Sequence, residues 1–144
     1  MREPIFRHEA EVDPVKVSRE GSDGFVHFRM IFDPVNGETE SAVLGVHEFV
    51  PGVDPILPHY HEEVEETVYV VTGTGLLRLG WDPDAMVEHM FEKGAAWFVP
   101  PCCYHQIIHT GKEKIKLVAS YFRNDGKPIS HKRVSYHHTV VHNP

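Results

Sequence analysis

The sequence predicts an all-β fold, a sandwich or barrel of short antiparallel strands, and two observations carry that prediction. Clusters of glycine, proline and asparagine interrupt the chain at short intervals, and β-branched or aromatic runs lie between them, as in all-β domains. Several of these runs alternate apolar with polar residues, which is the period of a strand with one buried face. The length of 144 residues suits one core, so we expect a single domain over residues 1–144.

The expected strands follow one another along the chain. They are residues 25–32, 41–50, 67–71, 76–81, 95–100, 104–109 and 115–122. Residues 83–91, PDAMVEHMF, fit a short helix and a hairpin arm equally well. The tail, residues 130–144, is expected to form a last strand that covers a sheet edge or crosses to a partner subunit.

Alternation within these strands separates inward from outward side chains. The inward face of the first strand is expected to hold Val26, Phe28, Met30 and Phe32. His27 then faces outward, which argues against it as a ligand. In the strand that follows His61, Glu66 shares the inward face with Val68 and Val70.

Charge and composition exclude several classes of function. The net charge of −7 and the absence of a basic stripe predict that no nucleic acid is bound. The N-terminus has no apolar signal-peptide region and the chain has no apolar run long enough for a membrane span, so we expect no membrane partner. Two adjacent cysteines, Cys102 and Cys103, offer no disulfide framework, which favours a reducing, cytoplasmic compartment.

The segment PHYHEEVEETVYVVTG, residues 58–73, carries the first chemical signal. Residues two apart in a strand point to the same side, so His59 and His61 are expected to project together. Neutral imidazole is a good ligand for zinc, iron, nickel and copper. The pair therefore predicts a metal site on a rigid strand.

Two spaced patterns extend that signal. In the first, six residues separate Gly52 from His59, four separate His61 from Glu66, and six more lead to Gly73. The second pattern runs Gly94, Pro100, Cys102, His105 and His109, with five, one, two and three residues between them.

These patterns closely resemble the two signature motifs of the cupin superfamily, over residues 52–109. The resemblance implies a small antiparallel β-barrel, or jelly roll, with one divalent metal held by His59, His61, Glu66 and His105. Zinc is favoured, and iron or another transition metal also suits the donors. Open positions on such a metal would leave room for water or substrate, as at catalytic sites.

The chain departs from those motifs at three points. One extra residue stands between Gly52 and His59, Cys102 replaces a glycine, and His109 replaces an asparagine. By alternation His109 shares a face with His105, from which it lies about 13 Å along the strand. His109 could therefore contact substrate. His47 precedes the first motif and is a candidate general base or an extra ligand, in which case the fourth ligand would be a histidine rather than Glu66.

A further resemblance concerns the activity. Residues 28–52 and 58–75 look like the small cupins of bacterial aromatic polyketide pathways, through an arginine-containing strand, a Gly–Glu–Thr loop and the strand before the first motif. This similarity implies an enzyme that cyclises and aromatises a poly-β-ketone by an aldol-type step, as in antibiotic-type secondary metabolism. His109, His47 or a metal-bound hydroxide would serve as the general base.

Other activities fit the same residues. An iron-dependent dioxygenase acting on an aromatic or a β-diketone is one alternative, and a non-catalytic cupin that binds a metal or small molecule is another. The expected cavity is apolar and partly aromatic, with Val68, Val70, Ile107, Trp97 or Phe98, and Phe28 or Met30 as lining residues. Such a lining suits a hydrophobic or aromatic small molecule. A homodimer is expected to cover the outer sheet face.

Overall fold

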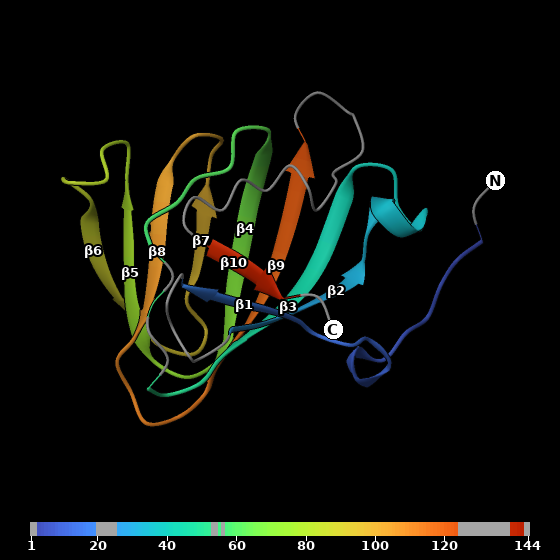
Figure 1. The fold of residues 1–144 in the computed structure, drawn as a ribbon, viewed down its shortest axis with the longest axis horizontal. Coiled ribbons are helices and arrows are strands. Elements are labelled where there is room, and N and C mark those ends of the chain that lie inside the picture. Colours follow the sequence, from blue (N-terminus) through green and yellow to red (C-terminus); the bar gives the residue numbers. More distant parts are fainter. Residues whose placement is uncertain (1–2, 20–25, 53–54, 56, 124–138, 143–144) are drawn as a thin grey trace.

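The computed structural model describes residues 3–19, 26–52, 55, 57–123 and 139–142. Within these ranges, ten strands form a seven-stranded and a three-stranded antiparallel sheet (Figure 1). The strands are β1 (Val15–Arg19), β2 (Val26–Phe32), β3 (Ala42–Phe49), β4 (Val64–Thr72), β5 (Gly75–Gly80), β6 (Val87–Phe91), β7 (Ala96–Val99), β8 (Tyr104–His109), β9 (Ile115–Arg123) and β10 (Thr139–His142). Two single-turn 3₁₀ helices, η1 (Glu9–Glu11) and η2 (Pro34–Asn36), complete the elements of this described part. The expected all-β fold is confirmed.

Crossovers between the sheets make this a jelly roll. The larger sheet runs β10-β1-β2-β3-β9-β4-β7, and the smaller one runs β6-β5-β8. Strand β9 therefore lies between β3 and β4, although it follows both by more than forty residues. Figure 1 shows β6, β5 and β8 at one end of the molecule, with β1 and β10 crossing in front of the larger sheet.

The core lies between the two sheets and comes from alternate residues of their strands. In β4 the buried positions Val64, Glu66, Val68 and Val70 alternate with exposed or half-buried ones. On β9, Ile115, Leu117 and Ala119 are buried, and Leu77 and Phe91 join them from the smaller sheet. Burial of these apolar surfaces stabilises the fold, and it fixes which side chains of each strand reach the interior.

Three local details differ from what the sequence predicts. The segment that fits helix or hairpin arm forms strand β6. Strand β1 was not predicted, because only two of its five residues are apolar. In β2 the register shifts between Met30 and Phe32, so Ile31 is buried and Phe32 only partly so. A β-bulge of this kind interrupts strict alternation.

The expected C-terminal strand lies largely outside the described residues. The part that is described, β10, pairs with β1 of the same chain, with Val17 opposite Val141. No helix in the described ranges is long and apolar enough to cross a membrane.

Candidate metal centre

A short antiparallel ladder holds the His59–His61 segment against the start of β8. The amide of His59 donates to the carbonyl of His105 at 3.1 Å, and the amide of His105 donates back at 2.8 Å. The amide of Cys102 donates to the carbonyl of His61 at 2.7 Å. Backbone bonds thus bring two segments more than forty residues apart into one register, and the histidine side chains follow.

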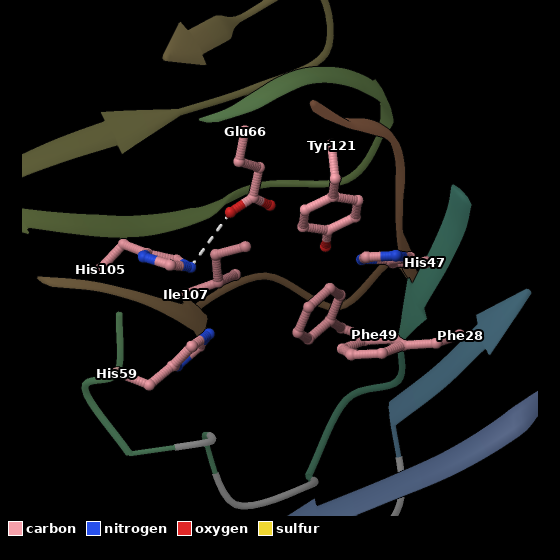
Figure 2. Close-up of a pocket in the computed structure, with 8 residues that line it drawn as sticks. All are labelled: Phe28, His47, Phe49, His59, Glu66, His105, Ile107 and Tyr121. Carbon is pink, nitrogen blue, oxygen red and sulfur yellow. Dashed lines mark ion pairs between the residues drawn. The ribbon is translucent and has the colours of Figure 1, made fainter. Parts of the chain in front are cut away.

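Three buried imidazoles converge at this ladder. One ring nitrogen from each of His59, His61 and His105 lies within 4.8 Å of the others. The Glu66 carboxylate enters from β4, and its Oε2 lies 3.1 Å from Nε2 of His105 (Figure 2). The same oxygen lies 3.6 Å from Nε2 of His61. The structure therefore brings together all four residues that the cupin resemblance implied as ligands.

Hydrogen bonds to the backbone orient two of the rings. Nδ1 of His59 lies 3.0 Å from the carbonyl of Leu57, and Nδ1 of His105 lies 3.3 Å from the carbonyl of Cys103. Each Nδ1 must donate to its carbonyl, so a neutral ring keeps its lone pair on Nε2. In His105 that lone pair would face the Glu66 oxygen at 3.1 Å. Two acceptors so close require a cation between them, either a proton or a metal ion.

The pKa values also suit a metal centre. Burial lowers the pKa of His59 well below its ordinary value and lowers that of His61, assisted for His59 by the other two rings. Burial alone would raise the pKa of Glu66, but the rings of His105 and His61 hold it well below its ordinary range. Metal ligands must be deprotonated. The lowered pKa values mean that His59 and His61 give up a proton readily and that Glu66 ionises readily, so these residues fit a divalent metal.

The opposite wall of the pocket is largely aromatic. Phe28, Phe49 and Tyr121 line it together with His47, and Ile107 closes the side toward β8 (Figure 2). The His47 ring stacks on Phe28, with centroids 4.0 Å apart, and lies 6.0 Å from the Tyr121 ring. Figure 2 shows Tyr121 between Glu66 and His47, with its hydroxyl turned into the pocket.

His47 is buried and neutral in this wall. Burial lowers its pKa to about 4, opposed by the charge of Glu66. Within the described residues its Nε2 has no hydrogen-bond partner. A Cβ at Gly45 would lie only 2.8 Å from that nitrogen, so glycine at this position makes room for the ring.

The other predicted residues divide between the pocket and its surroundings. Ile107 and Phe28 line it, whereas Val68 and Val70 are packed in the core. His109 lies outside the pocket, at the far end of β8, where its Nε2 contacts the carbonyl of Glu113 at 2.6 Å. The expectation that His109 contacts substrate is therefore corrected, because alternation sets the face of a residue but not its position along the barrel.

Tyr121 and Phe49 were missed by the sequence reasoning. The signal was present, because Tyr121 alternates with Ile115, Leu117 and Ala119 on the inward face of β9. What the sequence did not show is that β9 pairs with β3 and β4, opposite Val43 and Glu66. That pairing places the phenol in the pocket.

Comparison with known proteins defines the class. A family model described as a cupin domain matches residues 45–121, more than half of the chain. The chain belongs to the cupin family. Among curated proteins, none matches this sequence.

Solved structures confirm the fold. The polyketide cyclase RemF from Streptomyces resistomycificus is similar with a TM-score of 0.67 and 22% identity, over 93% of this chain and 91% of that one. A predicted oxalate decarboxylase from Thermotoga maritima gives a TM-score of 0.67 and 19% identity, over 83% of this chain and 99% of that one. Fe(II)-HppE gives a TM-score of 0.67 and 21% identity, over 83% of this chain and 60% of that one.

Proposed function

We propose that this protein is a metal-dependent cyclase that closes and aromatises a ring in a poly-β-ketone chain. The observation that carries the proposal is the pairing of two walls across one pocket. His59, His105 and Glu66, with His61 beside them, form one wall. Aromatic rings with a neutral His47 form the other. The likeness to RemF over nearly all of both chains supports the same class of substrate.

A divalent ion held by His59, His61 and His105, with Glu66 beside them, would act as a Lewis acid toward a keto oxygen. The remaining work belongs to the chain. His47 has a pKa of about 4, so it is neutral at physiological pH and a weak base. It would accept a proton from a CH₂ between two carbonyls only once the Lewis acid has made that CH₂ more acidic. The Tyr121 hydroxyl is placed to donate to an oxygen that becomes negative.

The aromatic wall supplies orientation. Phe28 and Phe49 restrict how a flexible ketone chain can bend, and Ile107 limits its approach toward β8. Holding the nucleophilic carbon near one particular carbonyl converts a random encounter into an intramolecular step. An apolar surface also excludes water from the carbanion until the ring closes, after which loss of one water aromatises it.

The test combines metal content with turnover. We expect protein purified without an affinity tag to contain near-stoichiometric divalent metal by mass spectrometry. With a synthetic poly-β-ketone thioester it should release a product lighter by one water molecule. His59→Ala should lose metal and turnover together, while His27→Ala, on the outward face of β2, should keep both. Turnover retained in a demonstrably metal-free protein would reject the proposal.

An iron-dependent oxygenase is the second candidate. Three imidazoles and a carboxylate suit iron as well as zinc, and the chain has the fold of Fe(II)-HppE. Oxygen uptake on adding an aromatic or β-diketone substrate to iron-loaded protein would favour this activity. Release of water from the ketone chain without oxygen uptake would favour the cyclase.

A further inference from the structure

A second cavity, open to solvent at the exposed residues His89, Met90 and Ala96, lies apart from the metal pocket. It lies between β5 and β6 of the smaller sheet and β7 of the larger one. Its lining is Leu77, Leu79, His89, Met90, Phe91, Ala95, Ala96 and Trp97. Its free volume is about 270 Å³, whereas the free volume in the metal pocket is about 30 Å³. None of the four candidate ligands lines the larger space, and the space at the ligands holds only a small group.

Two residues that line the second cavity lie beside residues of the metal pocket. Leu79 is the strand partner of His105 in the β5–β8 pairing, and Leu77 is the partner of Ile107. On the larger sheet, Trp97 of the second cavity pairs with Val68, two residues after Glu66. Leu79 and Trp97 are only partly buried. Leu79 is therefore the lining residue of the second cavity that lies beside a candidate metal ligand.

The size of the metal pocket does not match the substrate class. Sites for drug-sized molecules occupy about 300–1,000 Å³, and a poly-β-ketone long enough to form an aromatic ring system is of that size. The metal pocket, with about 30 Å³ of free volume, is roughly ten times smaller than the lower end of that range. The two spaces together approach the lower end of that range, because the second cavity holds most of the volume.

Polar groups in the second cavity suit a chain that carries oxygen atoms. The indole Nε1 of Trp97 is buried and has no hydrogen-bond partner among the described residues. His89 faces the same space from β6. A buried donor without a partner is costly, and a ketone oxygen on a bound chain would supply the missing acceptor.

We propose that the second cavity binds the distal part of the substrate chain, past Leu79, while its reacting dicarbonyl lies at the metal centre. This inference rests on the proposed function, because it assigns the long end of the same substrate. Leu79 would then have to turn aside as the chain enters. The lining predicts an apolar chain with carbonyl oxygens far from the reacting end.

The test uses zinc-loaded protein and two diketones, acetylacetone and its long-chain analogue lauroylacetone. Trp81 is exposed and Trp97 is the other tryptophan of the chain, so Trp81→Phe leaves Trp97 as the sole indole reporter. We expect lauroylacetone to bind at least about tenfold more tightly than acetylacetone and to change Trp97 emission. Acetylacetone should leave that emission unchanged.

The second part of the test fills the second cavity with a larger side chain. Ala95→Leu should abolish the advantage of lauroylacetone while leaving acetylacetone affinity and zinc content unchanged, which also shows that the variant folds. Ala85→Leu, in the exposed turn before β6, is the matched control. Lauroylacetone binding with silent Trp97, or unchanged in Ala95→Leu, would overturn the inference and leave the cyclase proposal standing. If neither diketone binds, both proposals fail.

Discussion

The two walls of the metal pocket are built on different physical principles. On one side, His59, His61 and His105 are held by backbone hydrogen bonds, and their rings crowd together with an ionised carboxylate. On the other side, His47 lies among aromatic rings, stacked on Phe28 and lacking a partner for Nε2 within the described residues. The first wall requires a cation, whereas the second disfavours charge.

This difference separates the role of His47 from the roles of His59, His61 and His105. Burial lowers the pKa of His47, His59 and His61 alike. The wall that holds the candidate ligands, here called the ligand wall, also contains the Glu66 carboxylate, an acceptor that makes a bound cation favourable. A histidine in the aromatic wall is suited instead to exchange a proton with a bound molecule.

The largest expected effect comes from the ligand wall. His105→Ala removes the ring nearest Glu66 and leaves that carboxylate buried beside one fewer partner. We expect metal affinity to fall by more than about 100-fold, beyond the cost of losing a supporting hydrogen bond, with loss of turnover. Metal titration of the variant measures the change.

The matched control for that variant lies on the same strand and face. His109→Ala removes a ring that contacts the Glu113 carbonyl outside the pocket. It should keep wild-type metal affinity and turnover within about twofold. If His109→Ala lost metal as His105→Ala does, metal binding would not depend on the ligand wall alone.

The next effect comes from the aromatic wall. His47→Gln keeps a polar side chain of similar length but removes the imidazole that is placed to accept a proton. We expect turnover to fall by roughly 10²–10⁴-fold, the usual contribution of a general base, while metal content stays unchanged. Single-turnover kinetics beside metal analysis would test this. Loss of metal in the variant would place His47 among the ligands.

The same histidine predicts how stability depends on pH. Its pKa is about 4 in the folded protein and 6.5 in the reference state, so the unfolded chain binds a proton more readily between these values. Stability should be complete above pH 6.5 and decline as the pH falls toward 4, by about 3 kcal/mol from this group.

Urea unfolding of metal-free protein at several pH values would measure that decline. Glu66, His59 and His61 act in the same direction, because their pKa values are also lowered. Comparing the wild type with His47→Gln isolates the contribution of His47. Over this pH interval the free energy of unfolding of the variant should fall by about 3 kcal/mol less than that of the wild type. If the free energy of unfolding falls equally with pH in the wild type and in His47→Gln, then His47 is not a buried, neutral residue.

The ligand wall was predictable from sequence and the aromatic wall largely was not. Alternation identifies the His59 and His61 pair, and the resemblance of two spaced motifs to those of cupins adds Glu66 and His105. Tyr121 and Phe49 enter through the β3–β9 pairing, which is a long-range contact. Local pattern reveals which face a residue occupies but not which strand lies beside it.

The same limit explains His47 and the second cavity. The facing of His47 depends on the register of β3 against β2, where it lies opposite Phe28. The cavity beside Trp97 depends on how the edge strands β6 and β7 approach each other across the two sheets. Neither arrangement follows from the period of a single strand.

The smallest expected effect concerns the turn that supports the ligand wall. Cys102 has φ of 66°, the left-handed region that favours glycine, and its amide holds the His61 carbonyl. Cys102→Gly should relieve the backbone strain and raise the free energy of unfolding by about 1 kcal/mol, reduced somewhat by the greater entropy of glycine in the unfolded chain.

The metal affinity of Cys102 variants shows whether the turn at Cys102 helps to position the ligands. If the backbone ladder alone positions the ligands, Cys102→Gly should bind metal as tightly as the wild type, since its amide still donates to His61. Cys102→Ala keeps the positive φ without the thiol and serves as the control, with no gain in stability expected. A gain in stability accompanied by weaker metal binding would mean that strain in this turn, and not the ladder, holds the ligand wall in place.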